Sequence, residues 1–478
     1  MRGFYQLVDD GALRRLSGAA FDMLDRLGMK VEHEGMLSAL KKLGCEVDDA
    51  AMHARFPSNV LDETLRHYSQ EGIGEFELPR PEGPLRTGTG GVFPHLLEWP
   101  SGVRRLATRE DVIAMTKMAD RLEAFSHVGL PVVDCQAPQR IEPILSRALV
   151  MQYTLKPFSG SEVIYGDNVK YLAELADIAA GGKAESTGVA SCNFAIAPLY
   201  LWRRACDCVM AKFECDIPFV AGTMPISGLS GPVTVAGTAA LMLAETLGCW
   251  TIARALRPEL PVGCIVCSGS LDMRTTRACF ASPEAALQDV AAVQVAHRIW
   301  GTGSVHTATS YIDAKTPGIQ ATYEKMFKAL CSAPFVGSFG PHPDGLLSAG
   351  QDYSPTQHML SMDIGTSINR FQRTFDVTDE TLGLEAIEQV GIDTGRTFLD
   401  HDHTLEHWRE EMWMPELMDR RIWQGDQEER RAEREMLEQA EARWRDAVAS
   451  YERPDIPEER LRAVEDVCRR ARKDILGA

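Results

Sequence analysis

The amino-acid sequence predicts an α/β protein built on a (β/α)8 TIM barrel, with a helical region before the barrel and a helical extension after it. From about residue 87 to 345, short apolar, β-prone runs alternate with helical segments of a dozen or more residues. Eight such repeats fit the roughly 250 residues that a closed barrel of parallel strands and crossover helices needs. An open doubly wound sheet is the main alternative, but no GxGxxG motif follows a predicted strand to support it.

The first region, residues 1–86, carries apolar residues at helical spacing. Residues 13–27 predict one helix that ends at Gly28, and residues 36–43 predict a second that ends at Gly44. The proline- and glycine-rich stretch 79–84 then predicts a linker. We therefore expect a helical lead-in to the barrel.

The barrel region, residues 87–345, contains the eight predicted strands and several clear helix starts. Thr108 followed by Asp111 is a capping-box signal, and Ser282, Pro283 and Glu284 supply a cap, a first-turn proline and a first-turn acid. The strands are predicted at residues 88–93, 125–133, 158–164, 189–197, 219–223, 262–268, 305–311 and 335–339.

The last region, residues 346–478, is helical and increasingly charged. Ser354 begins one helix with a capping box, and residues 427–449 predict a long polar helix with one apolar stripe. We expect that helix to pack on the barrel or on another subunit, and we expect a homo-oligomer.

Composition argues against several classes of function. The chain has 50 Lys and Arg against 68 Asp and Glu, a net charge of -18 that repels nucleic acids and anionic lipids. Its longest uncharged run, residues 222–244, is broken by Pro225 and Pro232, so no membrane span is expected there. The N-terminus does not resemble a signal peptide, which predicts a cytoplasmic protein whose 12 cysteines are reduced.

Common catalytic motifs do not explain the chain. Cys264 and Cys267 have CxxC spacing, but within a strand they point to opposite faces and cannot share a metal. His401, His403 and His407 could bind a metal only with a further ligand, and surface or cap roles are commoner, so no metal site is expected. The sequence has neither a GxSxG elbow nor a GxxxxGK[ST] loop.

The working residues of a barrel lie where its strands end, because the loops of the C-terminal face emerge there. The predicted strand ends carry aromatic rings, carboxylates and histidines. They include Glu98, Trp99, Asp134, Glu162, Asn193, His306, Tyr311, Asp313, Lys315, Phe339 and His342.

Several motifs, in order along nearly the whole chain, resemble the trimethylamine methyltransferase family. The main ones are residues 230–237, residues 271–275 followed by 282–284, and residues 312–317 followed by 320–321 and 323–325. Residues 24–30, 44–47 and 398–407 resemble that family as well. The resemblance implies a (β/α)8 barrel whose mouth presents a methylated amine to the cobalt of a corrinoid. It also implies that the chain itself binds no cofactor, because a separate partner protein would carry the corrinoid.

One position separates this chain from the trimethylamine enzymes of the family. Those enzymes place pyrrolysine just before the segment that corresponds to Ile312, Asp313, Ala314 and Lys315, and this chain has Tyr311 there. A quaternary ammonium leaves as a neutral tertiary amine and needs neither a proton nor covalent activation. The change therefore favours a quaternary amine such as glycine betaine, as in members of the family that lack pyrrolysine.

The protein's task would then be to hold a desolvated cation with one methyl group aimed outward. We expect Tyr311, Lys315 and Asp313 to form the catalytic segment. Aromatic faces hold a cation without neutralising it, at about 0.5–2 kcal/mol per contact. The aromatic candidates are Tyr311, Phe339, Phe93 and Trp99, the candidates for charge complementarity are Glu98, Asp134 and Glu162, and the candidate donors to a betaine carboxylate are His306, His342, Lys315 and Asn193.

Each candidate also has a structural alternative. Tyr311 could fill the barrel interior, Lys315 and Asp313 could form a loop ion pair, and His306, Phe93 and Trp99 could serve packing. Two other functions stay open: a non-catalytic barrel that binds a quaternary amine, and a demethylase that uses an acceptor other than a corrinoid, such as tetrahydrofolate.

Overall fold

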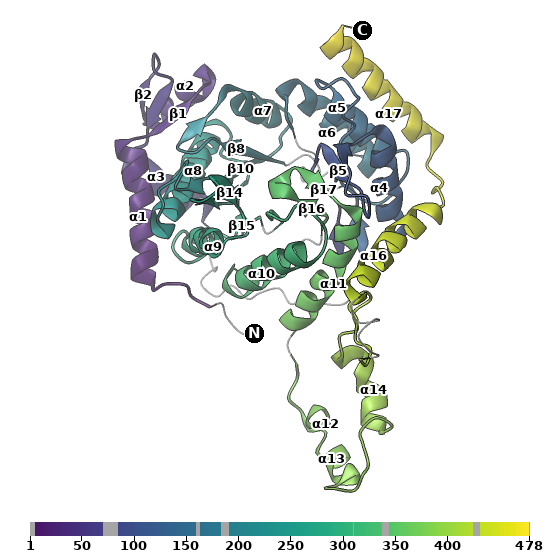
Figure 1. The fold of residues 1–478 in the computed structure, drawn as a ribbon. Helices are drawn as coiled ribbons and strands as arrows, with labels where there is room; N and C mark the ends of the chain where they lie inside the picture. Colours follow the sequence, from purple (N-terminus) through teal and green to yellow (C-terminus); the bar gives the residue numbers. More distant parts are fainter. Residues whose placement is uncertain are drawn as a thin grey trace.

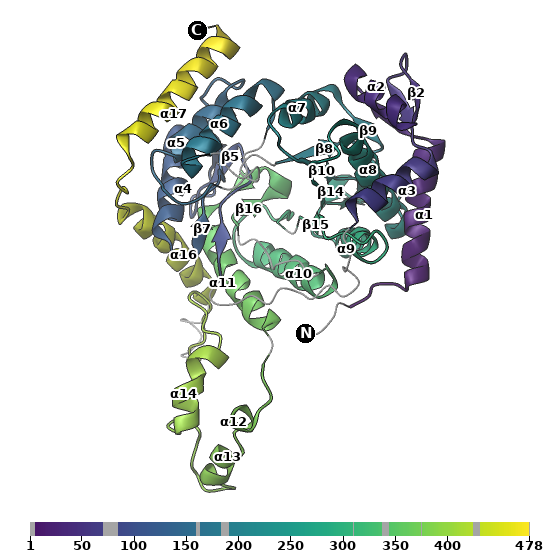
Figure 2. The same ribbon diagram turned by 180° about the vertical axis from the view of Figure 1, so that it is seen from behind.

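The fold combines a central set of short strands with helices packed around it, and a long arm leaves the body on one side (Figure 1). The computed structural model describes residues 5–69, 85–158, 163–182, 191–308, 310–336, 344–373, 375–423 and 431–477. Seen from behind, the same ring of helices surrounds the strands and the arm again points away from them (Figure 2).

The N-terminal part is a small α/β unit rather than helices alone. Helix α1 is capped by Asp9, whose side chain accepts a hydrogen bond from the Ala12 N–H, and α2 ends at Gly44 with a left-handed φ of 105°. Three strands join these helices in a sheet of order β2-β3-β1-β9. The elements are α1 (Asp10–Arg26), β1 (Met29–Val31), α2 (Glu34–Leu43), β2 (Glu46–Asp48), β3 (His53–Arg55), α3 (Ser58–Tyr68) and, from the body, β9 (Tyr200–Leu201).

Four parallel strands form the most regular sheet of the body, in the order β15-β12-β10-β8. In register, Phe219 lies opposite Val262, and Cys264 lies opposite Val305. The strands and the helices that follow them are β8 (Cys192–Ala195), α7 (Arg203–Glu214), β10 (Phe219–Thr223), α8 (Val235–Leu256), β12 (Val262–Val266), α9 (Pro283–Arg298), β15 (Val305–Thr307) and α10 (Ile319–Val336). These four strands confirm the predictions at 189–197, 219–223, 262–268 and 305–311, although three of them are shorter than predicted.

A second parallel set comes from the first half of the body. Strand β4 pairs with β7, and single bridges join Phe93 to Val132 and Val128 to Phe158. These pairings place the predicted strands at 88–93, 125–133 and 158–164 side by side. The elements of this half are β4 (Thr87–Gly88), β5 (His95–Leu97), β6 (Arg104–Leu106), α4 (Arg109–Arg121), β7 (Phe125–His127), α5 (Glu142–Val150), η2 (Gly166–Asn168) and α6 (Val169–Ala180).

The predicted eighth strand, 335–339, begins inside a helix. Phe335 and Val336 are the last two residues of α10, and residues 337–339 lie outside the described ranges. A short apolar run fits a buried helix as well as a strand, so periodicity could not decide between them. Within the described ranges, no strand pairing joins the two parallel sets, and the architecture shown is a mixed α/β fold.

The C-terminal part contributes strands as well as helices. Strand β17 pairs in parallel with β5, where Asp352 lies opposite His95. Helix α16 packs on α4 and α11, which confirms that the predicted long polar helix covers the body. The elements are β16 (Leu346–Leu347), η4 (Ser348–Gly350), β17 (Asp352–Tyr353), α11 (Pro355–Gln372), α12 (Asp379–Leu382), α13 (Leu384–Val390), α14 (Asp402–Glu411), α16 (Ala432–Ala449), α17 (Glu458–Ala471) and η5 (Arg472–Leu476).

The largest hydrophobic core surrounds helix α8. This helix is apolar on every side and packs against the N-terminal unit, β10 and α9. Among the described helices, it is the one that is long and apolar enough to cross a membrane, and 83% of its most apolar window is buried inside the protein. Burial on that scale is typical of the central helix of a large core.

Candidate functional site at the strand ends

A small second sheet lies beyond the carboxyl ends of β10 and β12. It consists of β11 (Ile226–Ser227), β13 (Gly269–Asp272) and β14 (Arg277–Cys279), in the order β11-β13-β14. The chain that leaves β14 reaches Phe280 and Ala281, whose backbone N–H groups both donate to the carboxylate of Asp313, each at 3.0 Å. The loop after β14 is thereby joined to the loop after β15.

Three charged side chains of α10 are buried beside the loop that carries Tyr311, and two of them, Glu324 and Lys328, bind its backbone. They are Glu324, Lys325 and Lys328, and each is at most 8% exposed. The Glu324 carboxylate accepts the N–H groups of Asp313 and Ala314 at 2.8 and 2.9 Å. Because the three residues lie on adjacent turns of one helix, α10 fixes the loop backbone from one side.

The two lysines have different partners: Lys328 binds the loop itself, whereas Lys325 binds Asp344, which lies outside it. Lys328 Nζ donates to the carbonyl of Tyr311 at 3.0 Å, with Ala308 O at 3.4 Å. Lys325 Nζ lies 2.6 Å from Asp344 Oδ1, and Asp344 also accepts a hydrogen bond from the Ser310 side chain. Burial alone would raise the pKa of Asp344, but the adjacent Lys325 ammonium and the hydrogen bonds lower it below its ordinary value, so the Asp344 carboxyl group stays ionised.

The ring of Tyr311 is half buried and packs against two neighbours. Its centroid lies 5.5 Å from that of Phe280, with the planes inclined by 46°. On the other side, the ring lies so close to Gly350 that a Cβ there would sit 2.5 Å from Tyr311 Cε1. The position of Tyr311 therefore depends on Phe280 and Gly350, and sequence reasoning had selected neither.

The predicted ion pair between Lys315 and Asp313 does not form through their side chains. Lys315 is exposed, and its ammonium donates to the backbone carbonyl of Asp313 at 2.7 Å. The carboxylate of Asp313 is occupied by the two backbone N–H groups described above. Asp313 thus shapes the loop, while Lys315 lies at its surface.

A cavity of about 440 Å³ opens at the carboxyl ends of the first three predicted strands. Its volume is in the range that holds a small-molecule ligand. The walls are mostly apolar and include Val92, Leu130 and Ile164, and the polar lining includes Asp134 and Glu142. This is where the structure places Asp134, one of the predicted substrate-binding residues.

Glu142, which sequence reasoning missed, is the more deeply buried of the two acids. Its carboxylate accepts hydrogen bonds from the Ser146 hydroxyl and from the backbone N–H of Asp134. Burial raises the pKa of Glu142 to about 7, although these hydrogen bonds oppose the shift and the nearby Asp134 carboxylate adds to it. The cavity therefore contains a carboxyl group that gains or loses its proton near neutral pH.

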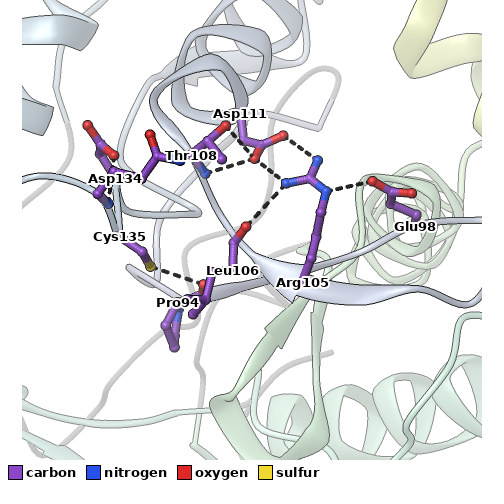
Figure 3. A network of polar contacts seen from close by, with 9 residues as sticks. Pro94, Glu98, Arg105, Leu106, Thr108, Asp111, Asp134 and Cys135 are labelled. Atoms are coloured by element: carbon purple, nitrogen blue, oxygen red, sulfur yellow. Dashed lines mark hydrogen bonds and ion pairs between the residues drawn. The ribbon is translucent and has the colours of Figure 1, made fainter.

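Glu98, predicted to complement a cationic substrate, is instead bound by a neighbouring arginine. Arg105 Nε donates to Glu98 at 2.6 Å, while the other guanidinium nitrogens bind the Asp111 carboxylate at 2.6 and 2.8 Å (Figure 3). Asp111 also closes the capping box of α4 by accepting the Thr108 N–H. The Glu98 carboxylate is therefore already paired with an arginine, which it shares with Asp111.

Cys135 lies beside Asp134 in the same network, and its thiol donates to the carbonyl of Pro94 at 3.2 Å (Figure 3). This contact ties the end of the second predicted strand to the segment after the first one. The two segments form one wall of the cavity, because Pro94, Asp134 and Cys135 all line it.

The predicted aromatic cage is not gathered around this cavity. Phe93 is buried in the core, where its ring covers Gly91, and Trp99 is half buried outside the cavity lining. Two other aromatic or basic candidates, Phe339 and His342, and the acid Glu162 lie outside the described residues.

The remaining candidates, Asn193 and His306, lie in the central sheet. The Asn193 amide oxygen accepts from Lys212 of α7 at 2.7 Å, so its side chain faces the helix layer and not the mouth. His306 is exposed on the opposite face from buried Val305, and desolvation by the surrounding protein lowers the pKa of its imidazole. The His306 imidazole is thus available for a hydrogen bond on that face.

The possible metal ligands serve structural roles where the structure describes them. Both Cys264 and Cys267 are fully buried, and burial raises the pKa of each thiol to about 12. His401 caps α14 by accepting the His403 N–H, as expected for a cap residue. Within the described ranges, no group of three or more His, Cys, Asp or Glu side chains could hold a metal ion.

Comparison with known proteins identifies a family whose sequence model matches this chain. The sequence model of the family described as trimethylamine methyltransferase (MTTB) matches residues 2–476. The glycine betaine methyltransferase of Desulfitobacterium hafniense strain Y51 is 26% identical, over 95% of each chain. The trimethylamine methyltransferase MttB of Desulfitobacterium hafniense strain DSM 10664 / DCB-2 is 24% identical, over 84% of this chain and 81% of that one.

Among solved structures, the Methanosarcina barkeri monomethylamine methyltransferase (MtmB) aligns with 93% of this chain and 95% of its own. The TM-score is 0.47 and the sequence identity is 11%.

Proposed function

Because the chain belongs to the trimethylamine methyltransferase family and is a methyltransferase, we propose that it moves a methyl group from a quaternary amine to the cobalt(I) of a corrinoid on a separate protein. Glycine betaine or a closely related compound is the proposed donor. The observation that carries the proposal is the family match across residues 2–476 combined with Tyr311 in place of pyrrolysine.

The identity of the leaving group supports a quaternary amine. When the bond between nitrogen and one methyl carbon breaks, both electrons stay on nitrogen, and a quaternary ammonium becomes a neutral tertiary amine. No proton has to be supplied and no covalent adduct is needed. The similarity to a glycine betaine methyltransferase over 95% of both chains agrees with this choice.

We further propose that the two parallel sets of strands close into a (β/α)8 barrel. In a closed barrel, the carboxyl ends of all strands surround one mouth. The cavity with Asp134 and Glu142, at the ends of the first three strands, and Tyr311, after the seventh, would then face the same opening. Closure of the barrel would therefore bring the cavity with Asp134 and the loop that carries Tyr311 into one site.

In this arrangement the side chains bind and orient, and none exchanges a proton with the substrate. Asp134 gives the cavity a negative charge that attracts the ammonium group, and the apolar walls contact its methyl groups. Tyr311, held by Lys328 and Gly350, presents an aromatic face to the cation from the other side of the mouth. The corrinoid, when bound, supplies the electron pair that accepts the methyl carbon.

The donor can be identified with the full-length protein and a reduced corrinoid protein. We expect mass spectrometry to detect the demethylated product from glycine betaine, choline or carnitine, and none from trimethylamine. No product from any quaternary amine, or faster demethylation of trimethylamine, would contradict the proposal. Product formed without the corrinoid protein would show that another acceptor is used.

The proposed role of Asp134 has its own test by calorimetry. Asp134→Asn should weaken binding of glycine betaine about tenfold, which corresponds to about 1.4 kcal/mol. The matched ligand is 3,3-dimethylbutyrate, which has nearly the same shape with carbon in place of the charged nitrogen. Its affinity should not fall, because it has no positive charge for Asp134 to attract, and an equal loss for both ligands would exclude a charge-recognition role for Asp134.

A further inference from the structure

The arm formed by residues 375–411 has almost no hydrophobic core of its own. Of its apolar side chains, Ala386 and Val390 are buried, at 5% and 7% exposure. Nine large ones are between 42% and 98% exposed, namely Phe375, Val377, Leu382, Leu384, Ile387, Ile392, Phe398, Leu399 and Leu405. So many exposed apolar side chains on one projection indicate a surface that is covered in the working protein.

The root of the arm holds it away from its own body. Arg370, near the end of α11, donates to the backbone carbonyl and the carboxylate of Glu411, where α14 ends. From that root the arm extends outward with α12, α13 and α14, and both views show it clear of the other helices (Figures 1 and 2). Its apolar side chains are therefore not covered by the chain they belong to.

The body carries an apolar groove of about 830 Å³, and no residue of the arm lines it. Helix α10 forms one side, and Leu360 of α11 with Met436 and Leu437 of α16 forms the other. On its rim, Ile319 is 73% exposed and Tyr323 is 68% exposed. Leu360, which lines the groove, belongs to α11, the helix from which the arm departs.

We propose that the arm seats in the α10/α16 groove of a second copy of this chain, and that the second copy's arm seats in return in the groove of the first. The exposed arm side chains and the open groove each provide the apolar surface that the other lacks. A reciprocal exchange uses the same two surfaces twice, which closes the assembly as a two-fold dimer.

Charge and area both favour this seat over contact between two arms. Residues 375–411 contain 11 acidic and 2 basic residues, so two arms side by side would repel each other. A stable interface buries about 800 Å² on each partner. Nine large apolar side chains supply a surface of that order, and reciprocal exchange doubles it.

The exposed side chains of α13 show which face of the arm is free to make the proposed contact. Leu384 and Ile387 are three residues apart, lie on one face and are 59% and 53% exposed, whereas Ala386 and Val390 face inward. Substitutions at Leu384 and Ile387 therefore change the proposed contact without disturbing the packing inside the arm.

The experiment measures the mass of the full chain in solution by light scattering at micromolar concentration. The wild type should be a dimer, or a larger assembly of dimers. The arm variant, Leu384→Glu with Ile387→Glu, and the groove variant, Ile319→Glu with Tyr323→Glu, should each raise the dissociation constant of the dimer at least a hundredfold. Glu385→Lys changes the charge by two units on the same helix as the arm variant. Glu385 is exposed and lies off the face shared by Leu384 and Ile387, so this control should stay a dimer.

Mixing the two variants separates this pairing from any other. A mixed dimer retains one intact contact, in which the unmodified arm of the groove variant enters the unmodified groove of the arm variant. Native mass spectrometry should therefore show more mixed dimers than either variant forms alone. A monomeric wild type, a dimeric arm or groove variant with unchanged circular dichroism, or a mixture without mixed dimers would overturn the proposal.

Discussion

The ring of Tyr311 rests on the backbone of Gly350, which has a φ of 85°. A Cβ atom added to Gly350 would lie only 2.5 Å from Tyr311 Cε1. A side chain at position 350 is thus opposed twice, by backbone strain and by the tyrosine ring. In the proposed function Tyr311 stands in place of the pyrrolysine of the trimethylamine enzymes, so Gly350 bears directly on the proposed site.

We predict that Gly350→Ala displaces the Tyr311 ring and lowers the rate of methyl transfer at least tenfold. The left-handed backbone alone would cost alanine about 1 kcal/mol. Gly181→Ala is the matched control, because Gly181 has a φ of 70° and an added Cβ there would meet nothing within 4 Å. If both variants lose the same stability and activity, contact with Tyr311 does not matter.

Lys328 gives a second prediction about the same loop. Lys328→Met should lower the free energy of unfolding by about 2–3 kcal/mol, because the carbonyl groups of Tyr311 and Ala308 lose a buried charged donor. Denaturant titration measures this loss. The same substitution at exposed Lys41 should cost less than about 0.5 kcal/mol, and a similar value at Lys328 would show that the ammonium does not hold the loop.

Much of the fold could be predicted because it depends on local patterns. Strand β10 occupies the predicted residues 219–223, and α9 and α11 begin after the predicted caps Ser282 and Ser354. Apolar periodicity and capping residues act within a few positions of the chain. The strand predicted at 335–339 was wrong at Phe335 and Val336, because a short apolar run carries no period that separates strand from helix.

The site was harder to predict because it depends on distant contacts. Glu142 gives no sign in the sequence that it will be buried beside Asp134 at the wall of a cavity. Glu324 and Lys325 stood within a recognised motif, but the bonds of Glu324 to the Tyr311 loop and of Lys325 to Asp344 follow from the docking of α10. The one available signal was charge on a helix that is otherwise largely apolar, since buried charges need partners.

Glu142 predicts a specific dependence of stability on pH. Its folded pKa, about 7, lies above the ordinary value of 4.5, so the folded state holds the proton more tightly than the unfolded state does. Its contribution to stability is therefore complete below pH 4.5 and is lost as the pH rises through 7. The loss is on the order of 3 kcal/mol when complete.

Glu142→Gln should remove that part of the pH dependence. Relative to the wild type, the variant should gain stability between pH 5 and pH 8, as measured by denaturant titration across this range. Glu245 and Asp289 also have raised pKa values, about 7 and 6, because both are fully buried. Some dependence should therefore remain in the variant, and a curve parallel to that of the wild type would refute a titrating Glu142.

Asp363 anchors residues 416–418, where the chain returns from the arm to the body. This buried carboxylate on α11 accepts the backbone N–H groups of Glu416, Leu417 and Met418 at 3.1, 2.8 and 3.2 Å. An amide cannot replace it, because asparagine has one acceptor oxygen and its NH2 group would face N–H donors. Asp363→Asn should therefore lower the free energy of unfolding by about 1–3 kcal/mol.

Hydrogen exchange locates the effect of this change. The amides of residues 416–418 should exchange faster in Asp363→Asn, whereas those of α8 should keep their protection, because local opening at the arm root does not require the core to unfold. Asp376→Asn, at an exposed position of the arm, should leave both sets unchanged. Unchanged exchange at 416–418 in Asp363→Asn would mean that α11 does not hold the arm through this carboxylate, and that other contacts fix its root.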